Sequence, residues 1–329
     1  MSDFLHSYTM KFRQLPLLFL SFLLLLACND DEDPNADFER RINEQVEEIE
    51  TYLADNSIDA TATNGYYLEQ ITENPSGKAP EQEDIILAYY EMQTLEGELV
   101  ERISSADGDE PETIPYIEGR VVLPLALYEI LGEMRAGEEV RVFLPFNRAF
   151  VNYELPNVFP SFSAMILQLE VAEVLSPDEF ALRQDAQIKA YLSDNNLEPA
   201  DSLEGGVYYF QTQEGEEPEV GPNNAVRVRY SGSLLDGTEF DSNVDSPTPF
   251  RVNMNEDRVI SGFKTALSAM SQAEEGVAIM PADEAYGPNY YAMPFVVVSD
   301  LIGQGIVPGQ AGLGTYSILR FDLEVEAVN

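Results

Sequence analysis

A bulky apolar side chain stands directly beside a carboxylate at Phe240-Asp241, just after a turn signal. The turn is Asp236-Gly237, where glycine can adopt a positive φ without a steric clash. A hairpin requires neither the ring nor the carboxylate, so the pair is a candidate for a functional site. Taken alone, such a pair is more often an ordinary core phenylalanine beside a solvated turn aspartate. The surrounding segments must decide between these two interpretations.

The chain repeats itself, and the repeats supply the elements that would position this pair. The run 49–56, IETYLADN, recurs as IKAYLSDN at 188–195, and four further blocks recur in the same order. One of them pairs GEMRAGEEVRVFLPFNRAF with SAMSQAEEGVAIMPADEAY. Such ordered repetition predicts two tandem domains of one fold, at 39–174 and 175–329.

Each repeat is expected to begin with an amphipathic helix and to continue as short strands. In the first helix, apolar residues recur every three or four positions from Phe38 to Leu53. The second helix begins at the capping box 176–179, SPDE. Strand signals such as VRVRY at 226–230 follow, interrupted by one amphipathic segment at 260–270. This order predicts an α+β fold, with an antiparallel sheet wrapped on one short helix.

The second repeat resembles the FKBP-type peptidyl-prolyl cis-trans isomerases over nearly the whole length of that domain. The resemblance rests on the runs VRVRYSGSLLDGTEFDSNVDSPTPFRV, VISGFKTALSAM, IMPADEAYG and LRFDLEV. From Tyr230 to Gly287 the spacing fits the family pattern without a gap. The resemblance implies an enzyme that acts on proline-containing proteins or peptides, and it makes both repeats FKBP-like domains.

The resemblance also assigns a proline pocket to the second repeat. The residues at the matching positions are Tyr230, Phe240, Asp241, Phe250, Val259, Ile260, Phe263, Tyr286 and Phe321. Phe240 and Phe321 are expected to form the walls and Phe263 the floor. The Ile260 N–H and the Tyr286 hydroxyl would bind the client's backbone, and Asp241 would face the rotating carbonyl. The resemblance thus makes Asp241, Tyr286 and Phe240 the catalytic residues and the others substrate-binding.

Rotation about an X–Pro imide meets a barrier of about 18–20 kcal/mol, yet no proton moves and no bond breaks. An apolar box favours the twisted imide, and a few fixed donors hold the flanking carbonyls. No metal, histidine or thiol is needed, so no cofactor is expected. The family usually has Trp at the floor, where Phe263 buries less surface. The alternative function is therefore an FKBP-like binding or chaperone lipoprotein with weak or no turnover.

The first repeat is expected to be catalytically silent. When Met134 is aligned with Met270, the counterparts of Phe240, Asp241, Phe263, Tyr286 and Phe321 are Val100, Glu101, Leu127, Phe150 and Leu167. Pro124 stands opposite Ile260 and has no N–H to donate. Because Tyr90 alone cannot rebuild the pocket, a structural or client-holding role is expected.

A segment longer than the family's usual loop separates Tyr286 from Phe321. Its apolar run 295–298, FVVV, could form an extra strand or cover the pocket as a lid. We expect the strand, because β-branched runs suit a pleated surface.

The N-terminus indicates an exported lipoprotein. Residues 1–27 are expected to be a signal peptide, because Lys11 and Arg13 precede an apolar run at 15–27 that is too short to span a bilayer. The run ends in LLAC, which resembles the bacterial lipobox and predicts a lipid anchor on Cys28. Residues 28–38 form an acidic tether that resembles the surface-export signal of Bacteroidetes lipoproteins. The predicted location is the cell envelope, anchored to the outer membrane and favouring its outer face.

The charge of the chain excludes one class of partner. Acidic residues number 59 against 18 basic ones, which gives a formal net charge of −41. Such a surface repels phosphate backbones, so nucleic-acid binding is not expected. We interpret the excess of carboxylates as a solvated surface.

Overall fold

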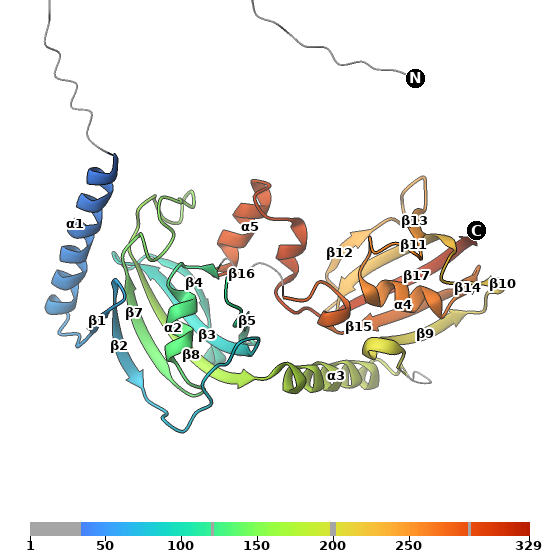
Figure 1. Ribbon diagram of the computed structural model, residues 1–329, viewed down its shortest axis with the longest axis horizontal. Helices are drawn as coiled ribbons and strands as arrows, with labels where there is room; N and C mark the ends of the chain where they lie inside the picture. Colours follow the sequence, from blue (N-terminus) through green and yellow to red (C-terminus); the bar gives the residue numbers. More distant parts are fainter. Residues whose placement is uncertain (1–33, 120–121, 198–201, 289–290) are drawn as a thin grey trace, which may run out of the picture. The chain divides into compact units, whose positions relative to one another are not determined.

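The computed structural model describes residues 34–119, 122–197, 202–288 and 291–329 (Figure 1). The chain divides into two units at Arg40, and of the first unit only residues 34–40, at the start of helix α1 (Pro34–Asp55), are described. Both sheets belong to the second unit, Arg41–Asn329. The predicted signal peptide and Cys28 lie outside the described residues. Within the described ranges, every helix is too short or too polar to cross a bilayer.

The first repeat folds into a seven-stranded sheet in which every pairing is antiparallel. The strand order is β1-β2-β7-β8-β3-β4, and β5 pairs with β3. The strands are β1 (Thr61–Thr63), β2 (Tyr66–Thr72), β3 (Ile85–Thr94), β4 (Leu99–Ile103), β5 (Glu112–Pro115), β7 (Glu139–Leu144) and β8 (Met165–Leu175). Helix α2 (Leu127–Glu133) buries Leu127, Ile130 and Leu131 in the core of this sheet.

The second repeat folds into a six-stranded antiparallel sheet of order β12-β11-β17-β15-β9, with β13 paired to β11. The strands are β9 (Tyr208–Gln213), β11 (Ala225–Leu234), β12 (Glu239–Ser242), β13 (Phe250–Asn253), β15 (Glu275–Met280) and β17 (Leu319–Val328). A small ladder joins β10 (Glu216–Glu219) to β14 (Ser271–Gln272). Helix α4 (Ser261–Ser268) lies against this sheet (Figure 1). It buries Phe263, Ala266 and Leu267 in the core of the domain.

The two sheets have the same topology. The order β2-β7-β8-β3-β4 of the first matches β9-β15-β17-β11-β12 of the second, and each sheet carries one short helix between corresponding strands. The predicted α+β fold with two tandem domains is therefore confirmed.

An amphipathic helix precedes each sheet, as predicted. Ile49 and Leu53 of α1 are buried in a cluster with Phe143 of the first sheet. Helix α3 (Pro177–Asp194) begins at the predicted capping box. The Ser176 hydroxyl accepts the Glu179 N–H at 3.3 Å, and the Glu179 carboxylate accepts the Ser176 N–H at 2.8 Å.

The expected strand at 295–298 is wrong. These residues begin helix α5 (Phe295–Gly303), whose buried residues Val297, Val298 and Leu301 follow a helical spacing. Intrinsic preference for strand is weak, and packing of this stripe decides the conformation. The segment is not a lid either, because Val297 and Leu301 belong to the hydrophobic core of the first domain.

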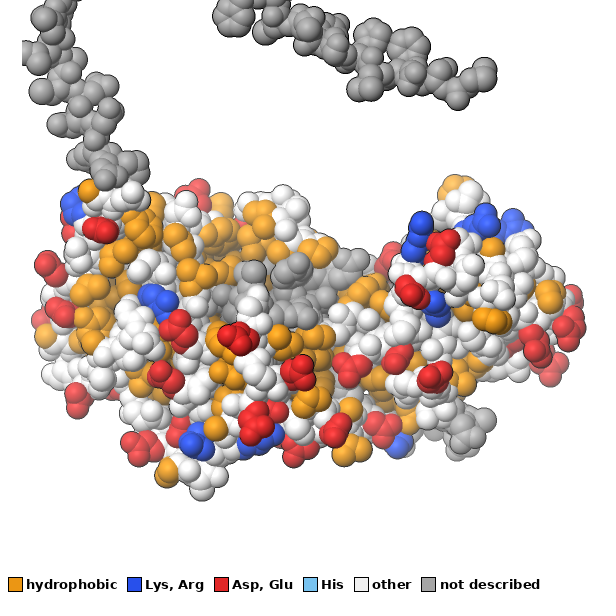
Figure 2. Space-filling model, viewed as in Figure 1, with side chains coloured by type: hydrophobic (Ala, Val, Ile, Leu, Met, Phe, Trp, Pro, Cys, Tyr) orange, Lys and Arg blue, Asp and Glu red, His pale blue; other side chains and the backbone are white. Residues whose placement is uncertain are grey.

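Acidic side chains are spread over the face drawn in Figure 2 and do not gather in one patch. Among the described residues, the buried carboxylates are Asp84 and Glu274. Asp84 accepts the Glu81 N–H at 3.0 Å, and Glu274 accepts the Tyr209 hydroxyl at 2.7 Å. Burial of a charge therefore occurs only with hydrogen-bond partners here, and most carboxylates remain in water.

Candidate active site

A cavity of about 540 Å³ lies in the second domain, between its sheet and the start of helix α4. Its lining residues are Tyr230, Asp241, Phe250, Asp257, Arg258, Val259, Ile260, Phe263, Tyr286 and Phe321. Eight of the nine predicted pocket residues are thus brought together from four strands, two loops and one helix. The ninth, Phe240, does not line the cavity.

The apolar part of the cavity is a set of aromatic rings packed edge to face. The Phe263 and Phe321 ring centroids are 5.1 Å apart at 83°, and Tyr230 meets Phe263 at 5.6 Å and 83°. Phe263 is 4% exposed and Phe321 is 3% exposed. Edge-to-face pairs place the positive edge of one ring on the negative face of the next, which fixes the orientation of each ring. The floor and one wall of the cavity are therefore apolar and closely packed.

Phe240 supports the wall from the side. Its ring packs edge-on against Phe321, with centroids 5.7 Å apart at 89°. Gly232 of β11 permits this approach, because a Cβ there would lie 2.8 Å from ring atoms of both Phe240 and Phe321. Gly232 was missed by the sequence reasoning, although a glycine inside a strand signals close approach of other groups.

The polar rim is formed by two tyrosines and one carboxylate. The Tyr230 hydroxyl donates to Asp241 Oδ2 at 2.7 Å, and the register pairs Asp241 with Gly232. Burial, and then the charge of Asp241, raise the pKa of Tyr286. Tyr286 thus remains a protonated donor, and its hydroxyl has no hydrogen-bond acceptor within the described parts of the chain.

The backbone at the start of α4 forms another edge of the cavity. Ile260 is the N-cap residue of this helix, and no side chain caps that end. The first N–H groups of a helix have no partner within the helix, so this end can donate to a carbonyl. Ile260 and Val259 both line the cavity, as predicted.

Two charged residues at the rim were not predicted. Arg258 pairs with Glu256 at 2.8 Å while its side chain remains 85% exposed, and Asp257 pairs with Lys264 at 2.9 Å. Their position directly before Val259 in the sequence was a usable signal.

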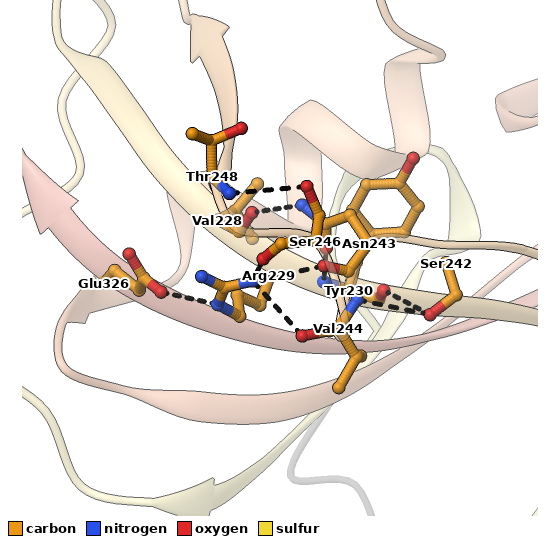
Figure 3. Close-up of polar contacts among 9 residues, drawn as sticks. All are labelled: Val228, Arg229, Tyr230, Ser242, Asn243, Val244, Ser246, Thr248 and Glu326. Carbon is orange, nitrogen blue, oxygen red and sulfur yellow. Dashed lines mark hydrogen bonds and ion pairs between the residues drawn. The ribbon is translucent and has the colours of Figure 1, made fainter.

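A hydrogen-bonded brace holds the loop that follows Asp241 (Figure 3). The Arg229 guanidinium donates to the carbonyls of Asn243 at 3.2 Å and Ser246 at 2.7 Å and pairs with Glu326 at 2.6 Å. Asn243 Oδ1 accepts the Tyr230 N–H at 2.7 Å. The brace ties the backbone of Tyr230 to the loop after Asp241, and the sequence reasoning did not identify it.

In the first domain, core side chains stand at several of the corresponding positions. The predicted counterparts Leu127, Phe150 and Leu167 are all buried in its hydrophobic core. In the strand register of the first domain, Met92 of β3 lies opposite Glu101 of β4 and Leu167 of β8. Gly232 of β11 lies opposite Asp241 of β12 and Phe321 of β17 in the same way. The fully buried Met92 side chain therefore takes the place of the hydrogen atom of Gly232. The pair Tyr90 and Glu101 is still hydrogen-bonded, like Tyr230 and Asp241.

Fold and site together define a tandem α+β protein with an aromatic pocket and a polar rim on its second sheet. Residues 216–325 match the family model described as FKBP-type peptidyl-prolyl cis-trans isomerase. The chain is 39% identical over 104 residues to FK506-binding protein 1A of Aspergillus fumigatus, which covers 32% of this chain and 77% of that protein. The chain belongs to the FKBP-type peptidyl-prolyl cis-trans isomerase family, and its enzyme class is that of the family.

Two bacterial relatives carry related names. The FKBP-type peptidyl-prolyl cis-trans isomerase FkpA of Aeromonas hydrophila is 28% identical over 176 residues, covering 53% of this chain and 57% of that protein. The outer membrane protein MIP of Legionella longbeachae is 35% identical over 108 residues, covering 32% of this chain and 45% of that protein.

Proposed function

We propose that the second domain isomerises X–Pro bonds of protein or peptide clients in the cavity between its sheet and α4. The observation that supports this most is the enclosure of one cavity by Tyr230, Phe263 and Phe321, with the Tyr286 donor at its rim. The cavity volume of about 540 Å³ accommodates a proline ring and its neighbours.

The proposed mechanism uses differential solvation. A planar imide is more charge-separated than a twisted one, so a dry aromatic box disfavours the planar ground state relative to the twisted state. The Tyr286 hydroxyl and the backbone at Ile260 donate to the carbonyls that flank the proline. Asp241, held by Tyr230, faces the carbonyl that rotates, and Phe240 keeps the Phe321 wall in place. Each 1.4 kcal/mol or so gained by the twisted state raises the rate about tenfold.

The decisive experiment is a proline-isomerisation assay on the soluble fragment 29–329. We expect turnover that Asp241→Val and Phe240→Ala each reduce while circular dichroism remains unchanged. Turnover indistinguishable from buffer in the unaltered fragment would instead support the binding or chaperone module.

We further propose that the protein assists folding in the cell envelope, attached by a lipid on Cys28 to the outer membrane. The lipobox supports this, as does the similarity to a relative named as an outer membrane protein. The full-length protein should enter the detergent phase after expression in a bacterium that processes lipoproteins, and Cys28→Ala should remain unprocessed. Equal processing of both forms would contradict the anchor. Protease treatment of intact cells decides whether the acidic tether leads to the outer face.

A further inference from the structure

The segment that follows Tyr286 leaves its own domain and enters the first one. Met293 is 1% exposed, Val297 is fully buried, and Leu301 is 9% exposed. All three belong to the hydrophobic core of the first domain, together with Met92, Leu127 and Leu167 among others. The apolar contacts of this segment are therefore with the domain whose pocket has lost its aromatic lining.

Main-chain and side-chain hydrogen bonds attach the segment as well. Strand β16 (Tyr291–Ala292) pairs in parallel with β6 (Val122–Leu123), and the Met293 N–H donates to the Leu123 carbonyl at 2.9 Å. The Phe295 N–H donates to Glu101 Oε2 at 2.6 Å. Further along α5, Asp300 Oδ2 accepts the Tyr153 hydroxyl at 2.6 Å.

These contacts fall on the counterparts of the second domain's pocket. Glu101 corresponds to Asp241, because Glu101 lies opposite Met92 in the strand register as Asp241 lies opposite Gly232. Each carboxylate also accepts a hydrogen bond from a tyrosine hydroxyl. Leu123 precedes Pro124 as Val259 precedes Ile260. The segment thus combines strand addition at a pocket edge with apolar anchors, a common mode of peptide recognition.

The surface around Glu101 and Leu123 in the first domain corresponds to the pocket of the second domain. We propose that this surface is a receptor for an apolar peptide segment, and that residues 291–307 of the same chain are its resident ligand. A covalently attached ligand acts at an effective concentration of about the millimolar range. The receptor is therefore closed to free clients, and the first domain holds its own chain in place of a client.

The test uses a fluorescent synthetic peptide of residues 291–307 and a full-length chain in which 293–301 is replaced by Gly and Ser. The peptide should gain a saturable binding site on the replaced chain that the unaltered chain lacks. Binding of Met293-Pro294 to the second-domain cavity is common to both chains. In the replaced background, Glu101→Gln should weaken binding about tenfold, the ratio that corresponds to 1.4 kcal/mol or so. The matched variant Glu96→Gln, which changes an exposed carboxylate of the same domain, should leave binding unchanged. Equal binding to both chains, no binding to a folded replaced chain, or equal weakening by Glu96→Gln and Glu101→Gln would overturn the proposal.

Hydrogen exchange in the intact chain gives an answer even if the replaced chain does not fold. The Phe295 amide should be protected, and Glu101→Gln should accelerate its exchange about tenfold, because the Gln oxygen accepts only a weaker, neutral hydrogen bond in place of a charge-assisted one. The control Glu96→Gln changes an exposed carboxylate of the same domain and should have no effect. An unprotected Phe295 amide, or equal exchange in both variants, would contradict the proposal. Neither readout involves turnover, so failure here leaves the isomerase proposal unaffected.

Discussion

The first prediction concerns the hydroxyl group of Tyr286. Tyr286→Phe removes the donor whose pKa is raised by burial, while the ring that lines the cavity remains. We expect kcat/KM to fall roughly tenfold, equivalent to loss of one hydrogen bond of about 1.4 kcal/mol in the twisted state. Tyr89→Phe in the first domain is the matched control, and a proline-isomerisation assay compares the two. An equal decrease in both variants would remove Tyr286 from the mechanism.

The second prediction concerns Gly232, a residue without a side chain. Gly232→Ala would place a Cβ 2.8 Å from the Phe240 and Phe321 rings, so the wall must move. Crowding of a packed core costs about 1–3 kcal/mol, and we expect a lower melting temperature and lower kcat/KM. Gly303→Ala is the control, because a Cβ there meets no atom within 4 Å. Unchanged activity in Gly232→Ala would show that the wall tolerates displacement.

At the scale of residues, the family resemblance predicted the side chains that line the cavity but not the residues that hold those side chains in place. Tyr230, Phe263 and Phe321 were predicted because their types and spacing follow a family pattern. Gly232 and Arg229 were not, because their roles depend on close approach and on a loop path that spacing alone does not contain. Phe240 was predicted as a wall and instead buttresses one.

At the scale of elements, we predict how the stability conferred by the capping box at the start of helix α3 depends on pH. Hydrogen bonds from the Ser176 backbone and hydroxyl, then the ion pair with Lys78, lower the pKa of Glu179 to about 2. A lowered carboxylate pKa contributes stability above the ordinary value near 4.5, and this contribution is lost as the pH falls through about 2. Glu179→Gln should therefore melt below the unaltered chain at pH 7, and the difference should shrink in acid.

The neighbouring substitution Asp178→Asn is the control for this helix start, since no described residue bonds to that carboxylate. Thermal unfolding followed by circular dichroism between pH 7 and 2 measures all three chains. A difference for Glu179→Gln that persists unchanged at pH 2 would contradict a role for the ionised capping box.

Elements were predictable where a local rule and the repeat agreed. The capping box predicted the start of α3, and the repeated blocks predicted two domains of one fold, which the shared strand order confirms. The run FVVV was assigned to a strand because its composition favours one, yet it forms a helix. Val297 of this run is buried in the core of another domain, and packing between domains is something that no local rule can include.

Net charge carries the prediction for the whole molecule. With a formal charge of −41, the folded chain repels itself. Screening shortens the Debye length from about 30 Å at 0.01 M salt to about 8 Å at 0.15 M. We therefore expect the melting temperature to rise over this range of sodium chloride, whereas an uncharged osmolyte at equal osmolality should raise it less. A melting temperature that falls with salt would show that ion pairs such as Arg141–Glu69 outweigh the repulsion.

The position of α5 within the core of the first domain has a consequence for biogenesis. A ribosome or export channel releases the chain from its N-terminus, so the strands of the first sheet emerge well before Met293, Val297 and Leu301. Until those residues arrive, the first domain exposes the apolar surface that they later cover. The last step in the folding of the N-terminal half therefore follows synthesis of most of the C-terminal half, and this surface is open to proteases and to aggregation in the interval.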